Sequence, residues 1–180
     1  MGAEQAPKRV VAPTFEEIFE HEFGYVWHVL RRLGVPARDL EDLTQHVFLQ
    51  VHGQLTKFDA TRPLRPWLFA FALNAAGNYR ALKRHRVELA VVPPEFSDPR
   101  PSADEQLILK QELQLAELAL SQVALERRGV LMLHEIEGHA MPEIAEVLGI
   151  PLNTAYSRLR LARQDYERAV RRLRARRGEG

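Results

Sequence analysis

The sequence predicts an all-α protein in which two small helical domains are joined by a proline-rich linker. Apolar residues recur at the three- and four-residue spacing of helices, and no stretch shows the alternation, bounded by hairpin turns, that is typical of strands. Four prolines lie close together between Val91 and Ser102. Because proline interrupts regular structure, we expect domains at residues 14–87 and 104–175 and a linker at residues 88–103.

Two helices open the first domain. Apolar residues follow helical spacing over residues 15–30 and predict a helix with one apolar face. Gly34 and Pro36 then end it. A second helix begins near Asp39 and carries one apolar stripe as far as Leu55.

A loop at residues 57–66 and a third helix over residues 67–86 complete the first domain. The first half of this helix is apolar nearly all round, which predicts that it is buried. In the second domain Ser102 and Glu105 have the spacing of a capping box and predict a helix start. Residues 130–136 supply another helix.

The composition excludes several classes of protein. The chain has 180 residues, 46% of them hydrophobic and 27% charged, which are values of a globular protein. The absence of cysteine excludes a disulfide scaffold, a zinc ribbon and a thiol nucleophile, and it suits a reducing compartment. No apolar run approaches the ~20 residues that span a bilayer, and residues 1–13 lack a signal-peptide core. We therefore expect a soluble, cytoplasmic protein without membrane insertion.

Charges are strongly segregated although the net charge is only +1. Residues 60–87 contain six lysines and arginines and no acid, residues 102–146 are mainly acidic, and residues 156–177 contain nine arginines against Asp165 and Glu167. Either basic block alone is typical of a solvated helix face. Two such blocks inside patterned segments favour a polyanionic partner.

Residues 141–163 have the pattern of a helix-turn-helix. Ala145 is small where the two helices cross, Gly149 stands where the turn needs a positive φ, and Asn153 is expected to cap the second helix. One face of the second helix is apolar, and the other carries polar and arginine side chains that suit the major groove. A helical hairpin inside a bundle would show the same apolar pattern, and the arginines favour DNA.

Two groups of motifs resemble one known family. The downstream group comprises Ile144–Pro151, Thr154, Ser157–Leu159 and Ala162–Arg163. The upstream group comprises Asp39–Leu43, Gln45, Val47–Leu49, Pro66–Phe69, Ala72, Asn74, Tyr79–Arg80 and Arg84–Arg86. They resemble regions 4 and 2, respectively, of the extracytoplasmic-function (ECF) group of bacterial RNA polymerase sigma factors. The resemblance covers about residues 15–173, with the regions in the family's order.

The resemblance implies that the protein directs core RNA polymerase to specific promoters and helps to open them. The implied partners are promoter DNA, the β′ clamp helices and the β subunit of the polymerase, and an anti-sigma factor. The acidic helix of region 2 would bind the polymerase through Glu41, Asp42, Gln45, Phe48 and Leu49. Taken alone, Phe48 is equally an ordinary core residue and the acids a solvated face.

Promoter contacts are also implied residue by residue. Opening DNA requires cations along the displaced strand, aromatic surfaces and a polar base pocket, and the loop from Phe58 to Arg65 is the candidate pocket. The minus-ten element would be bound by Arg62, Arg65, Asn74, Asn78, Tyr79, Arg80, Lys83, Arg84 and Arg86. Trp67 and Phe69 are interpreted as core residues. The minus-thirty-five element would be read in a salt-dependent manner by Asn153, Thr154, Tyr156, Ser157, Arg158, Arg160 and Arg163.

Five sites depart from the family pattern. Leu73 and Asn78 replace an arginine and an aspartate, Val123–Ala124 replaces a leucine-proline pair, Ala140 replaces a capping serine or threonine, and Tyr156 replaces a lysine. We expect a shifted promoter preference rather than a loss of function.

Other functions are less well supported. His134 and His139 are five residues apart, so their rings would lie about 140° apart on a helix and would not share a metal ion. Since neither a phosphate loop nor a nucleophile elbow is present, we expect no enzyme activity, metal or cofactor. The rivals that remain are a helix-turn-helix regulator that binds duplex DNA unaided, and a sigma-like protein that only sequesters polymerase.

Overall fold

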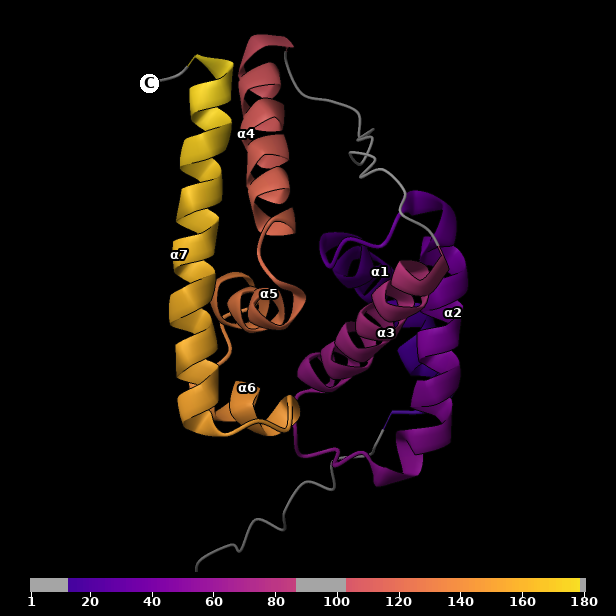
Figure 1. Ribbon diagram of the computed structural model, residues 1–180. Helices are drawn as coiled ribbons and strands as arrows, with labels where there is room; N and C mark the ends of the chain where they lie inside the picture. The colour runs from indigo at the N-terminus through magenta and orange to yellow at the C-terminus, as the bar shows by residue number, and fades with distance from the viewer. Residues whose placement is uncertain (1–12, 87–102, 179–180) are drawn as a thin grey trace, which may run out of the picture.

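The computed structural model of the chain describes residues 13–86 and 103–178, and all regular structure in these two stretches is helical, as predicted (Figure 1). The predicted linker at 88–103 lies almost wholly outside them. The helices are α1 (Phe15–Arg32), α2 (Ala37–Gln54), α3 (Leu64–Arg86), α4 (Ala103–Ser121), α5 (Leu125–Leu131), α6 (Met141–Val147) and α7 (Leu152–Arg177), with a 3-10 turn η1 (Leu55–Lys57) and a π-helical turn η2 (Met132–Ile136). None of the helices described here combines the length and the apolar character that crossing a bilayer requires.

Helices α1, α2 and α3 pack around a common core. Val26, Leu30, Leu68 and Ala72 are buried there, as the apolar periodicity predicted. Phe48 of α2 is also fully buried, with 1% of its surface exposed, and its ring stacks on that of Phe23 with 5.9 Å between the ring centroids. Of the two aromatic residues interpreted as core, Phe69 is buried and Trp67 is half-buried between Phe58 and Phe71.

Two predicted helix starts need correction. Helix α3 begins at Leu64 rather than Trp67, because Pro66 falls in the first turn, where a helix needs no N–H group. Helix α7 begins at Leu152, and the residue before it, Pro151, holds the extended conformation of a cap (φ −58°, ψ 142°). Asn153 is therefore the second residue of the helix and not its cap. The predicted cap at Ser102 lies outside the described residues.

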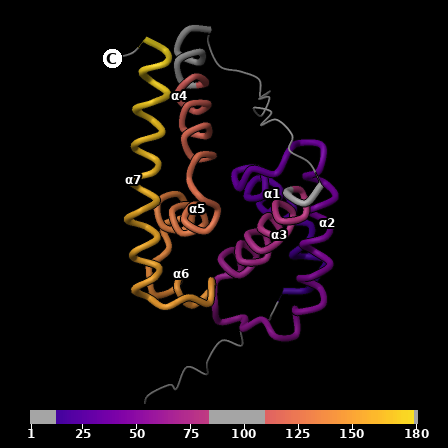
Figure 2. Tube along the Cα trace, in the orientation of Figure 1, coloured from indigo at the N-terminus to yellow at the C-terminus, as the bar shows by residue number. Residues whose placement is uncertain are grey.

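Helices α1 to α3 form the first unit of the molecule, and helices α4 to α7 form the second unit. The second unit contains a helix-turn-helix and two long helices, α4 and α7, that pack against each other. Helices α6 and α7 form the predicted motif, and Gly149 between them has the expected positive φ of 62°. Helix α7 continues for 26 residues, so that its second half runs along α4, as Figures 1 and 2 show. Acidic α4 and basic α7 meet there through an ion pair of 3.1 Å between Glu112 and Arg174.

One buried arginine joins the two units. Arg128 of α5 has 1% of its surface exposed, and no acid among residues 13–86 and 103–178 pairs with it. Its guanidinium donates hydrogen bonds to the carbonyl oxygens of Ser121 (2.5 Å), the last residue of α4, of Val123 (2.8 Å), two residues later, and of Leu33 (2.9 Å), just after α1. Burial, together with the cation of Arg80, lowers the pKa of Arg128 to about 9. The last carbonyl groups of a helix have no hydrogen-bond partner within the helix. The side chain of Arg128 therefore supplies donors to carbonyl groups at the ends of both α1 and α4.

Replacing Arg128 tests this role. In Arg128→Met the side chain still fills the space, but the carbonyls lose their donors, and each unsatisfied buried group costs about 1–3 kcal/mol. We expect the free energy of unfolding in urea to fall by ~2–4 kcal/mol. The control is Arg127→Met on the same helix, where a partly exposed ion pair with Asp165 (2.7 Å) is lost at a cost of at most ~1 kcal/mol. Equal losses in the two variants would contradict the role of Arg128.

Candidate nucleic-acid interface

A polar recess of about 570 Å³ lies between α2 and α3. Two of the predicted DNA-binding residues, Asn74 and Asn78, line it one helical turn apart. The other lining residues are Gln50, Gly53, Gln54 and Phe71. Carboxamides donate and accept hydrogen bonds as base edges do, and an aromatic ring offers a stacking surface. The three residues from α2 were missed in the sequence, where only the spacing of Gln50 and Gln54 on one helix face could have indicated them.

The predicted base-pocket loop beside this recess is internally braced. Asp59 accepts hydrogen bonds from the backbone N–H (3.0 Å) and the hydroxyl (2.7 Å) of Thr61, which lower the pKa of its carboxyl group. Phe58 turns inward onto Trp67, with 4.8 Å between the ring centroids. Arg62 is exposed but paired with acids on two sides, at 3.4 Å from Asp59 and 2.6 Å from Glu146. Its charge is therefore already partly neutralised in this conformation.

An aspartate on α2 orients two predicted DNA contacts on α3. Tyr79 donates its hydroxyl proton to Asp39 Oδ2 over 2.5 Å, and Lys83 Nζ lies 3.1 Å from the same oxygen. Lys83 Nζ also lies 5.0 Å from the centroid of the Tyr79 ring. The hydrogen bond from Tyr79, and then Lys83, lower the pKa of Asp39. A ring and a cation are thus held side by side at the surface, as stacking and phosphate binding require.

The other four arginines predicted to contact the minus-ten element differ in how far they are available to DNA. Arg65 is exposed and pairs with Glu22 at 3.0 Å. Arg80 points inward, because its guanidinium donates to the carbonyl oxygen of Leu33 over 2.6 Å. Its predicted phosphate contact is therefore not available in this structure. Arg84 and Arg86 belong to the last turn of α3, and their side chains lie outside the described part of the chain.

The predicted polymerase-binding residues lie on the solvent face of α2, with one exception. Glu41, Gln45 and Leu49 follow one another at four-residue intervals and are exposed, and so is Asp42 beside them. Leu49 has 71% of its surface exposed, so its side chain is accessible. Phe48 is buried against Phe23, so its predicted direct contact is wrong for this conformation. The Phe48 side chain instead belongs to the hydrophobic core that holds α2 against α1.

The predicted recognition surface is the exposed side of the first turns of α7. Asn153, Tyr156, Ser157, Arg160 and Arg163 are exposed, whereas Thr154 and Arg158 are half-buried. Two of these arginines are held by acids of α5 and η2, Arg158 by Glu126 at 3.2 Å and Arg163 by Glu135 at 2.5 Å. Within the described residues Arg160 has no such acid, so its guanidinium is the one most available to a base edge.

Histidines and carboxylates show no metal-binding arrangement in the stretches 13–86 and 103–178. The His134 ring instead forms a hydrogen bond of 3.0 Å with the carbonyl oxygen of His139. The His139 ring lies 3.2 Å from the Glu143 carboxylate. Both rings therefore brace the turn before α6.

Two models of known protein families match the chain, one in each helical unit. The family model Sigma-70 region 2 matches residues 18–86, and the model Sigma-70, region 4 matches residues 113–165. The first match includes the recess and the acidic face of α2, and the second includes the helix-turn-helix. Both matches agree with the regions that the motifs indicated.

Individual relatives match over most of their length. The RNA polymerase sigma factor CnrH of Cupriavidus metallidurans is 29% identical over 144 residues, which are 74% of each chain. The ECF RNA polymerase sigma-E factor of Escherichia coli K12 is 27% identical over 153 residues, 77% of this chain and 78% of that one.

Two solved structures share the fold. CnrH in complex with the cytosolic domain of CnrY superposes with a TM-score of 0.57 and 25% identity, over 85% of this chain and 84% of that one. The sigma factor RpoE of Bartonella quintana, in complex with the anti-sigma factor NepR, gives a TM-score of 0.63 and 20% identity over 87% and 96%.

The match of the first helical unit to region 2 and of the helix-turn-helix unit to region 4 identifies the chain as a transcription initiation factor. The relatives matched over about three quarters of their length, 74% and 78%, specify which kind. The chain belongs to the ECF group of bacterial RNA polymerase sigma factors, which direct core polymerase to promoters.

The Asp39 cluster predicts a defined pH dependence. The pKa of Asp39 is lower in the folded chain than the unfolded value of about 3.9, so its stabilisation is complete above that value and is lost as the pH falls through the folded pKa. We expect Asp39→Asn to lower the melting temperature at pH 7, and the difference from wild type to vanish once the pH has fallen below the folded-state pKa of Asp39. Thermal melts across pH measure this, with Asp42→Asn on the same helix as control. A deficit of the same size at every pH would contradict it.

Proposed function

We propose that residues 14–87 bind core RNA polymerase and the melted minus-ten element, and that residues 104–175 read the minus-thirty-five element as duplex. The polymerase contact would use Glu41, Asp42, Gln45 and Leu49 on α2. The minus-ten contacts would use the recess of Asn74 and Asn78 with the Tyr79 and Lys83 pair beside it, and Arg62 and Arg65 from the loop. Each assignment joins a surface of suitable chemistry to a region that the family models match.

The exposed side of α7 is the observation that supports duplex reading best. The helix-turn-helix presents Ser157 and Arg160 on the same side of the helix, one turn apart. An arginine in the major groove pairs with the O6 and N7 atoms of guanine, and hydroxyl groups bind base edges or phosphates. Tyr156, also exposed, stands where the family commonly has a lysine, and this supports a promoter preference of its own.

The protein itself would carry out no chemical step. Its contribution would be binding energy that localises the polymerase and favours the opened strand, while the polymerase transfers the nucleotides. An anti-sigma factor is the proposed regulator, since the Bartonella relative of the same fold was solved in complex with one.

Run-off transcription tests the function. Core RNA polymerase and the purified chain are incubated with a pool of promoter fragments, and transcripts are compared for wild type, Arg160→Ala and Asp42→Ala. We expect specific transcripts that each substitution weakens by roughly 10-fold or more, because a base contact or a polymerase contact of about 1–3 kcal/mol is lost.

Matched controls separate these contacts from general charge effects. Arg171→Ala removes an exposed arginine about three turns further along the same side of α7, and Glu20→Ala removes an exposed acid of α1. Both should transcribe as wild type. If no transcript appears while the chain alone binds duplex DNA specifically, it is a regulator that acts without the polymerase, and the proposed function is wrong.

A further inference from the structure

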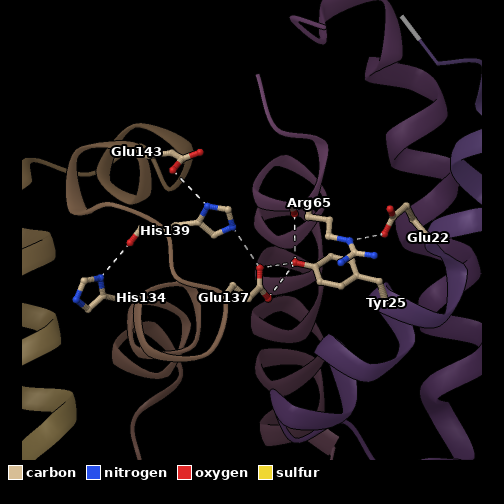
Figure 3. A network of polar contacts seen from close by, with 7 residues as sticks. All are labelled: Glu22, Tyr25, Arg65, His134, Glu137, His139 and Glu143. Carbon is tan, nitrogen blue, oxygen red and sulfur yellow. Dashed lines mark hydrogen bonds and ion pairs between the residues drawn. The ribbon is translucent and has the colours of Figure 1, made fainter. Parts of the chain in front are cut away.

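Arg65 lies in the first turn of α3, and two residues of α1 hold its side chain (Figure 3). Its Nε atom donates a hydrogen bond of 3.0 Å to Glu22 Oε2. Its guanidinium carbon lies 5.1 Å from the centroid of the Tyr25 ring. The Arg65 side chain nevertheless has 60% of its surface exposed. The guanidinium is therefore held at one edge and on one face, while most of the side chain remains open to solvent.

These contacts leave one edge of the Arg65 guanidinium unoccupied. A guanidinium carries five N–H donors in one plane, and Glu22 accepts the hydrogen bond from Nε. Within the described residues the two terminal amino groups of Arg65 form no hydrogen bond. Those two groups make up the edge that binds a phosphate group through two parallel hydrogen bonds. Glu22 and Tyr25 thus fix Arg65 in an arrangement that keeps its phosphate-binding edge available.

The Tyr25 ring is itself held in place by hydrogen bonds of its hydroxyl group. The hydroxyl donates to the Glu137 carboxylate, with distances of 2.9 and 3.0 Å to the two oxygens, and lies 3.3 Å from the backbone carbonyl oxygen of Arg65. Burial raises the pKa of Tyr25, so the hydroxyl remains a donor at neutral pH. Glu137 belongs to the second unit, which contacts the first unit here and also where Leu73 of α3 lies against Gly129 of α5.

Arg65 differs from the other arginines assigned to the minus-ten element. Arg62 is paired with carboxylates on two sides, at 3.4 and 2.6 Å. Arg80 donates inward to the carbonyl oxygen of Leu33. Among the three arginines of this set whose side chains the structure describes, Arg65 alone combines one carboxylate contact with an aromatic ring under its guanidinium. An aromatic face supports a guanidinium without using any of its N–H donors.

We propose that Tyr25 and Glu22 are positioning residues for a DNA phosphate contact made by Arg65. The inference rests on the proposed function, which assigns Arg65 to the minus-ten strand. An arginine side chain has many rotamers and loses this freedom when it binds a phosphate. The Tyr25 ring and the Glu22 carboxylate restrict the side chain beforehand, so less freedom is lost on binding and the affinity is higher. Neither positioning residue touches the DNA itself.

Two substitutions of Tyr25 separate its ring from its hydroxyl group. Tyr25→Leu removes the aromatic face under the guanidinium, whereas Tyr25→Phe keeps that face and removes only the hydroxyl. Both variants lose the hydrogen bond to Glu137, so a merely structural role of Tyr25 would affect them alike. A positioning role through the ring predicts that Tyr25→Leu binds DNA more weakly and that Tyr25→Phe rescues the affinity.

Binding of the full chain to a fluorescent 20-nucleotide oligodeoxythymidine is measured by anisotropy at low salt. We expect Arg65→Met, Tyr25→Leu and Glu22→Met each to bind roughly three- to tenfold more weakly than wild type, because one phosphate contact is lost or less well oriented. Tyr25→Phe should stay within about twofold of wild type. The control Glu20→Met, which removes an exposed acid of the same helix, should not bind more weakly than wild type. Circular dichroism verifies that each variant keeps its helix content.

Double variants show whether the effects act through Arg65. In the Arg65→Met background, Tyr25→Leu and Glu22→Met should weaken binding no further, because the side chain that they position is absent.

Several results would overturn the positioning role: wild-type affinity of Arg65→Met, additive losses in the double variants, or equal losses in Tyr25→Leu and Tyr25→Phe. Tighter binding by Glu22→Met would also overturn it, since that result is expected if the carboxylate only repels phosphates. The assay does not involve the polymerase. Failure of the run-off assay would therefore leave the positioning role standing and would overturn the proposed function alone.

Discussion

The buried guanidinium of Arg128 is the interaction on which the arrangement of the molecule depends. Two chain segments, one just after α1 and one at the end of α4, carry carbonyl groups that face the interior, and a planar side chain with five N–H donors is able to serve them together. The cost of burying its charge is visible in its lowered pKa. Because the carbonyl of Leu33 belongs to the first unit and those of Ser121 and Val123 to the second, the same side chain that folds α5 also fixes the two units against each other.

Most of the fold could be predicted because periodicity encodes which face of a helix is buried. The apolar stripes of α1, α2 and α7 could be predicted in this way. The positive φ at Gly149 could also be predicted, from the position of a glycine in the turn of the helix-turn-helix. The helix starts were harder to predict, because Pro66 and Pro151 were interpreted as helix breakers. Proline is in fact well tolerated in the first turn of a helix or just before it. How the two units pack against each other could not be predicted, because it depends on contacts between residues far apart in the sequence, such as Leu73 and Gly129.

The candidate site, like the fold, could be predicted only in part. Residue type and spacing identified the exposed acids of α2 and the polar side of α7. Sequence could not reveal which charged side chains already have partners within the chain, such as Arg62 with Glu146 or Arg80 with the carbonyl of Leu33. Nor could it decide between the two interpretations of Phe48, because a helix residue at the edge of an apolar stripe is buried or exposed according to its neighbours. Here the Phe23 ring buries it.

The central claim is that this chain places core polymerase on promoters and favours the opened strand, and permanganate footprinting tests it most directly. Permanganate oxidises unpaired thymines, so a labelled promoter fragment reports strand opening base by base. The account predicts reactive thymines at the minus-ten element when chain and core polymerase are both present, and none with either alone. Protection of duplex DNA by the chain alone, with no thymine made reactive by adding core polymerase, would contradict the account.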